Sequence, residues 1–214
     1  MRLDSILVAA CELTAFASWA VNFKKFRELK NKLFTVYLSI IVVTELANIF
    51  FATSINSWYN IIVTHFNVPM QFIFLFYFLV YKPKKINRVI VILFTAIYLA
   101  FFITERLNFF VRPANFDSLS YGVGCLLLIS SILIAIINIF KFDDPLAYNQ
   151  NTLFWIIMGL IIYYIGSFPY QNFRNFLWSH DSYTNTTYLL HYLSQTFNCI
   201  MYLLFAYAVK WKLN

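Results

Sequence analysis

Seven long apolar segments, separated by short polar ones, limit what this chain can fold into. A helix needs about 20 residues to cross the roughly 30 Å hydrocarbon core of a bilayer. The segments that reach or approach this length lie at about 4–21, 33–54, 59–81, 89–104, 119–140, 153–170 and 188–209. We therefore expect an all-α fold, in which residues 1–214 form a single polytopic membrane domain with a bundle of seven transmembrane helices.

The charge content supports lipid as the surrounding solvent. Only 12% of the residues are charged and 61% are hydrophobic, with a mean hydropathy of +0.69. Soluble domains carry about 25% charged and about 45–50% apolar residues, so this chain has too few charges to cover a water-facing surface. The net charge of +7 comes from bases beside the apolar segments, which predicts contacts with the lipid bilayer and no nucleic-acid partner.

The basic residues are divided unequally between the two sets of alternating loops. Twelve follow the first, third, fifth and seventh segments: Lys24, Lys25, Arg27, Lys30, Lys32, Lys82, Lys84, Lys85, Arg88, Lys141, Lys210 and Lys212. The other set holds only Arg2, Arg106, Arg112 and Arg174. Short loops rich in Lys and Arg stay in the cytoplasm, so we expect the N-terminus outside and the C-terminus inside. The abundance of Phe, Tyr, Asn, Ile and Lys is typical of an AT-rich bacterial genome. We therefore predict a multi-pass protein of the bacterial inner membrane.

The first segment also has features of a cleaved signal peptide. Arg2 precedes it, and Ser18-Trp19-Ala20 fits a small-x-small cleavage site. Two acids count against this interpretation. Asp4 lies in what would be the basic region of a signal peptide, and Glu12 interrupts what would be its apolar core. We favour an uncleaved helix, whereas cleavage would leave six helices with the same orientation.

Two acids lie within the apolar segments. Glu12 and Glu45 each fall about eight or nine residues from the outer end of their helix, roughly 12–14 Å deep at about 1.5 Å per residue. Acids in a membrane usually face the bundle interior. We expect both carboxyls at the same level, protonated or hydrogen-bonded, because an isolated carboxylate there is costly.

Polar residues recur at helical spacing in three further segments. The third contains Thr64, Asn67 and Gln71, the sixth Gly159, Tyr163, Gly166 and Tyr170, and the seventh Tyr188, His191, Gln195, Asn198 and Tyr202. Such stripes either join helices, at about 0.6 kcal/mol per polar contact, or line a cavity. The second interpretation predicts an outward-facing pocket for protons or a small ligand, formed by Glu12, Glu45, Asn48, Asn67, Gln71, Tyr163, His191, Gln195 and Asn198.

The remaining segments carry less polar chemistry. The fourth offers only Thr95 and Tyr98 in its interior, so we expect it at the lipid-facing periphery. Pro69 is expected to kink the third helix. The cysteines Cys11, Cys125 and Cys199 are all far apart in sequence and are interpreted as packing residues.

Several patterns of membrane enzymes are absent from the sequence. It contains no His-Glu-x-x-His, Gly-x-Ser-x-Gly or Cys-x-x-Cys run and no Gly-rich phosphate loop. A retinal protein needs a lysine within a helix, but Lys210 and Lys212 stand at the end of the last segment. We therefore expect no enzyme activity, no metal and no cofactor.

Three stretches resemble a family of small seven-helix membrane proteins of Bacteroidota that carries no assigned activity. They are Phe154-Trp155-Ile156-Ile157-Met158-Gly159-Leu160-Ile161-Ile162-Tyr163-Tyr164-Ile165-Gly166-Ser167-Phe168, then Met70-Gln71-Phe72-Ile73-Phe74-Leu75-Phe76-Tyr77, and Ala208-Val209-Lys210-Trp211. In that family an acid often stands where this chain has Gln71. The resemblance implies a link to sensor kinases and no catalytic residue.

These features predict a sensory or signalling component of the membrane. Its pocket would bind a small ligand or protons, and its basic inner surface would contact a cytoplasmic or membrane partner. That surface comprises Lys24, Lys25, Arg27, Lys30, Lys32, Lys82, Lys84, Lys85 and Arg88. Two alternatives remain open, namely a small-solute or proton-coupled transporter with Glu12 and Glu45 as coupling acids, and a structural subunit of a larger membrane complex. The scarcity of glycine favours the sensor, since alternating-access proteins tend to use broken helices.

Overall fold

A computed structural model describes residues 3–26, 28–51, 57–80, 85–109, 118–142, 151–179 and 185–212, with side chains over somewhat shorter stretches. These residues form seven α-helices and two short 3-10 helices, and no strand occurs within the described ranges. The elements are α1 (Leu3–Val21), η1 (Phe23–Lys25), α2 (Leu29–Phe51), α3 (Ser57–Val80), α4 (Lys85–Phe109), α5 (Ser118–Phe142), α6 (Thr152–Ser179), α7 (Asn185–Ala208) and η3 (Val209–Lys212).

The all-helical fold is confirmed, but two helices are longer than the apolar segments predicted. α4 has 25 residues and α6 has 28, so the expected ends at Thr104 and Tyr170 were wrong. Hydropathy marks only the apolar part of a helix, whereas backbone hydrogen bonding continues through polar residues such as Arg106 and Asn172. Pro69 and Pro169 lie inside α3 and α6.

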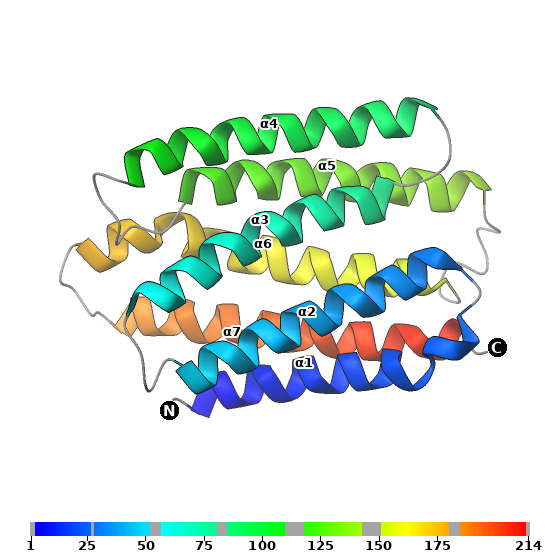
Figure 1. Ribbon diagram of the computed structural model, residues 1–214, viewed down its shortest axis with the longest axis horizontal. Coiled ribbons are helices and arrows are strands. Elements are labelled where there is room, and N and C mark those ends of the chain that lie inside the picture. Colours follow the sequence, from blue (N-terminus) through cyan, green and yellow to red (C-terminus); the bar gives the residue numbers. More distant parts are fainter. Residues whose placement is uncertain are drawn as a thin grey trace.

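Six of the helices close a ring. α1 packs against α2 and α7, α2 against α3, α3 against α5, α5 against α6, and α6 against α7. α4 lies outside this ring, against α3 and α5 (Figure 1). Only 6% of its apolar stretch Arg88–Leu107 is buried, which confirms the expected peripheral position. Tyr98 is its inward contact, with its ring 5.2 Å from that of Phe72.

The exterior of the bundle suits a lipid solvent. Three helices contain stretches long and apolar enough to cross a membrane, Arg88–Leu107, Leu119–Phe140 and Thr152–Phe173, and two shorter apolar stretches are Ile6–Val21 and Phe66–Val80. Large apolar side chains are exposed on all seven helices. The two chain termini lie at opposite ends of the bundle (Figure 1). The part of the chain that the structure describes therefore has the character of a membrane protein.

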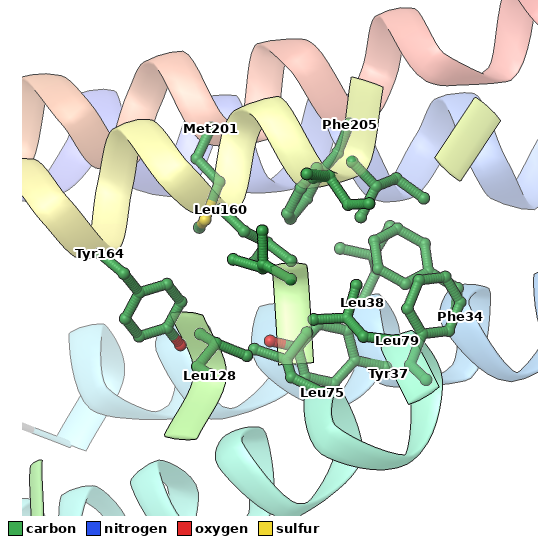
Figure 2. Close-up of a cluster of buried hydrophobic side chains, with 14 of the residues drawn as sticks. Phe34, Tyr37, Leu38, Leu75, Leu79, Leu128, Leu160, Tyr164, Met201 and Phe205 are labelled. Carbon is green, nitrogen blue, oxygen red and sulfur yellow. The ribbon is translucent and has the colours of Figure 1, made fainter. Parts of the chain in front are cut away.

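The two ends of the bundle differ in charge. We call one end the basic end, because Lys24, Lys25, Lys30, Lys32 and Lys210 lie there, where α1 and α7 finish and α2 begins. The opposite end, at which α1 begins, is the N-terminal end. The buried core that reaches from the middle of the bundle to the basic end is apolar and rich in aromatic rings. Figure 2 shows part of it, with Phe34, Leu75, Leu128, Leu160 and Phe205 converging from five helices.

Trp19 ties α1 into the ring. Its side chain is completely buried, and its indole Nε1–H donates a 2.8 Å hydrogen bond to the backbone carbonyl of Phe205 in α7. Its ring also lies 4.7 Å from that of Phe34 in α2. Trp19 thus contacts both neighbours of α1. Trp19, the middle residue of the sequence that resembled a cleavage site, is a core residue here, and the six-helix alternative would leave the ring open between α2 and α7.

We expect Trp19→Ala to lower the free energy of unfolding by about 3–5 kcal/mol, because it removes a fully buried indole and leaves a cavity. Trp19→Phe retains much of the packing but leaves the Phe205 carbonyl without its donor, so a smaller loss is expected. Denaturant titration of the protein in detergent micelles measures both. The control Leu7→Ala lies at an exposed position. If Trp19→Ala had the same free energy of unfolding as the wild type, this result would contradict the closed ring of helices.

Candidate functional site

Buried polar side chains that face other helices gather in the N-terminal half of the bundle. Glu12, Ser120, Ser167 and Ser194 are all buried there. In the basic half, by contrast, the buried hydroxyls of Thr35 and Ser131 donate to backbone carbonyls of their own helices, those of Asn31 and Leu127. Asn31 and Thr152 are buried in the basic half as well, so the feature that distinguishes the N-terminal half is the buried acid Glu12.

Glu12 is the central acid of this half. It stands in the middle of α1 with only 4% of its side chain exposed, between the buried Ala9 and Ala15 of the same helix face. The Tyr202 hydroxyl of α7 is placed to hydrogen-bond the Glu12 carboxyl. The carboxyl oxygen Oε2 is buried and has no hydrogen-bond partner within the described ranges. A buried polar atom in this state is costly, so Glu12 is a strong candidate for binding chemistry.

Glu45 interacts electrostatically with Glu12, as the matching depths of the two acids predicted. It is partly buried in α2. The preceding residue, Thr44, accepts a 3.2 Å hydrogen bond from Asn67 Nδ2 of α3, which fixes α2 to α3 next to the acid in the sequence. The structure therefore brings Glu12, Glu45 and Asn67 to neighbouring places in adjacent helices.

Much of the α6 stripe serves helix packing. A Cβ atom on Gly166 would overlap the Phe197 ring, and one on Gly159 would meet the Met201 carbonyl oxygen at 3.1 Å. The absence of side chains at these two positions lets α6 approach α7 closely. The structure thus assigns the glycines of the stripe to the interface between the two helices.

The other predicted pocket residues are distributed over this half. The Tyr170 hydroxyl and His191 Nδ1 lie 3.2 Å apart and join α6 to α7 near the N-terminal end. Tyr163 is an electrostatic neighbour of Glu12. Gln71 in α3 and Gln195 and Asn198 in α7 are partly buried. The side chain of Asn48 lies outside the described residues.

Tyrosines complete the surroundings of Glu12, and sequence reasoning missed some of them. Tyr37 of α2 is buried and interacts electrostatically with Glu12, and Tyr121 of α5 lies beside Tyr163. The buried Cys199 of α7 adjoins both Glu12 and Cys11. By spacing alone, a tyrosine in an apolar helix cannot be distinguished from a packing residue. The position of Glu12 was therefore the only sequence feature that indicated polar groups at this place.

The basic surface was predicted from the loops, and part of it is described. Lys24, Lys25 and Arg88 are exposed. The Lys30 ammonium lies 4.7 Å from the centre of the Phe78 ring, which anchors it over α3. Lys32 lies 5.9 Å from the Phe23 ring. Arg27, Lys82 and Lys84 lie outside the described residues, as does the side chain of Lys85.

No protein-family model, curated protein or solved structure matches this chain. Its resemblance to small seven-helix proteins of Bacteroidota therefore stays a prediction. Within the described side chains no group of three or more His, Cys, Asp or Glu residues could hold a metal ion. The inferences that follow rest on the residues themselves.

We expect Gly166→Ala to destabilise the bundle by about 1–3 kcal/mol, because the new methyl group would overlap the Phe197 ring. Thermal unfolding in detergent, converted to free energy, measures the loss. Phe197→Leu in the same chain should restore part of it by removing the overlapping ring atoms. The control Ala10→Gly changes the same single methyl group at an exposed position of α1. If the effects of Gly166→Ala and Phe197→Leu on the free energy of unfolding were fully additive, the two positions would not be in contact.

Proposed function

We propose that this chain is a seven-span protein of a bacterial inner membrane that senses protons or a small ligand arriving from outside. The N-terminus would lie outside and the C-terminus inside. The observation that carries the proposal is the buried Glu12, with its unpartnered Oε2, its acidic neighbour Glu45 and its tyrosine partner Tyr202. Ionisable groups inside a membrane bundle are costly and commonly mark a functional site.

The aromatic core supports sensing over transport. Trp19, Phe34, Phe72, Phe76 and Phe205 are completely or almost completely buried between the polar half and the basic end. A solute that crossed the bundle would have to displace such rings from close packing. A signal needs only a small change in helix packing. A transporter with Glu12 and Glu45 as coupling acids is the second candidate, favoured by the same carboxyl pair.

The basic end supplies a surface for inner partners. Lys24 and Lys25 are exposed beside the start of α2, and Lys210 is exposed at the end of α7. Basic side chains next to membrane-spanning helices attract anionic headgroups, each at about 1 kcal/mol. We propose that this surface meets the inner leaflet and an acidic signalling partner, with no catalytic role for the chain.

The carboxyl pair is tested by removing one charge at a time. In nanodiscs, we expect a pH-dependent change in tryptophan fluorescence that Glu12→Gln and Glu45→Gln abolish, because both substitutions keep the shape but not the ionisable group. Glu28→Gln is the control, since Glu28 is exposed outside the spans. A pH-sensitive dye inside proteoliposomes should report no proton flux. Flux that Glu45→Gln removes would establish the transporter instead, and a response that survives both substitutions would reject the site.

Orientation is tested by cysteine labelling in whole cells. A membrane-impermeant maleimide should label Tyr188→Cys at the N-terminal end and leave Lys25→Cys unlabelled until the cells are opened, in a background with Cys11, Cys125 and Cys199 replaced by Ala. We also expect Gln at Lys24, Lys25, Lys30 and Lys32 together to give a mixed orientation, because these bases hold the first loop inside. Labelling of Lys25→Cys in intact cells would overturn the proposed topology.

A further inference from the structure

Three hydroxyl side chains follow one face of α6. Tyr163, Ser167 and Tyr170 are spaced by four and three residues, which places them on the same side of a helix. Tyr163 interacts electrostatically with Glu12, and the Tyr170 hydroxyl lies 3.2 Å from His191 Nδ1 of α7. The face extends over about 10 Å at about 1.5 Å per residue. It therefore connects the buried acid with the N-terminal end of the bundle.

Ser167 is the middle member of this hydroxyl ladder. Its side chain is completely buried, and its Oγ makes no hydrogen bond of ordinary geometry with the part of the chain that the structure describes. The hydroxyls of Tyr121 and Tyr163 nevertheless lie close to it. Ser167 thus supplies a buried hydroxyl between the two tyrosines of the ladder.

The described surroundings of Glu12 favour a proton as the ligand. Among the described residues, the titratable groups that interact with it are Glu45 and Tyr37 of α2, Cys199 and Tyr202 of α7, and Tyr163 of α6. None of these neighbours is a lysine or arginine that would balance two carboxylates. Glu12, Tyr37, Cys199 and Tyr202 are all buried, so the carboxyl is enclosed by packed side chains. A proton neutralises a carboxylate without occupying volume.

We infer that protons reach the Glu12–Glu45 pair from the N-terminal end along the Tyr163–Ser167–Tyr170 ladder, which His191 contacts at its outer end. This inference rests on the proposed sensing function and names its stimulus. A proton that enters beside His191 passes to Tyr170, then through the Ser167 hydroxyl to Tyr163 and on to the carboxylate. Each hydroxyl accepts one proton and releases its own, so only the carboxylate is changed, to a carboxylic acid.

Infrared spectroscopy after a rapid pH drop tests the path on the full chain in nanodiscs. The carboxylic-acid C=O band that Glu12→Gln removes reports protonation of Glu12. We expect Ser167→Ala and Tyr163→Phe to slow the appearance of this band by about tenfold or more and to leave its final amplitude unchanged. Ser131→Ala is the matched control, since Ser131 is equally buried but donates to the Leu127 carbonyl of its own helix. Its rate should equal that of the wild type.

The outcomes separate the ladder from the sensing site. A band that appears at the wild-type rate in both ladder variants would overturn the path while the carboxyl pair remains a proton site. The tryptophan fluorescence could change with pH although no infrared band of protonated Glu12 appears at any pH at which the protein stays folded. That outcome would contradict protonation of Glu12 as the stimulus. Absence of both responses would reject the sensing function as well.

Discussion

Closure of the ring depends on the contact between the first and last helices. α1 and α7 both run from the N-terminal end to the basic end, so they pack in parallel. The indole of Trp19 bonds the backbone of α7 at Phe205, and nearer the N-terminal end Glu12 meets Tyr202. These two contacts lie on one line of packing between the helices. The same seam that holds the bundle together therefore contains the acid on which the proposed function rests.

In lipid, apolar side chains gain little by leaving their surroundings, so helices associate through close packing and polar contacts. The bundle uses both. Gly159 and Gly166 remove the bulk that would separate α6 from α7, and aromatic rings fill the interior toward the basic end. Polar contacts such as Asn67 to Thr44 hold the opposite half. Aromatic packing is thus concentrated toward the basic end, beyond the buried acid Glu12.

The sequence predicted the described helices well, because hydrophobic length and periodicity follow from simple helical geometry. The equal depths of Glu12 and Glu45 predicted that they are neighbours, and the two acids interact electrostatically in the structure. Helix ends were less predictable, since α6 continues past Tyr170 through polar residues to Ser179. The orientation is still inferred from the distribution of Lys and Arg among the loops, and the number of spans from the length of the apolar segments.

The meaning of the polar stripes could not be read from spacing. On α6, Gly166 packs against Phe197 of α7 whereas Tyr163 lies beside Tyr121 of α5, although both belong to one predicted stripe. A helix face about 100° wide contacts more than one neighbouring helix. Only the order of the helices in the ring determines which helix each residue of that face contacts. Tyr37 was missed for the same reason, because nothing in α2 distinguishes it from a packing residue until α1 stands beside it.

A chain of aromatic contacts gives a change at Glu12 a physical route to the basic end. Trp19 lies two turns beyond Glu12 on α1, and its ring is 4.7 Å from Phe34, which is 4.9 Å from Phe78. Lys30 caps this series, 4.7 Å above the Phe78 ring. Closely packed rings cannot deform independently, so a shift of α1 against α7 would displace the residues under the basic surface. The proposed sensor needs no open passage, because the packing that would block solutes would also couple its two ends.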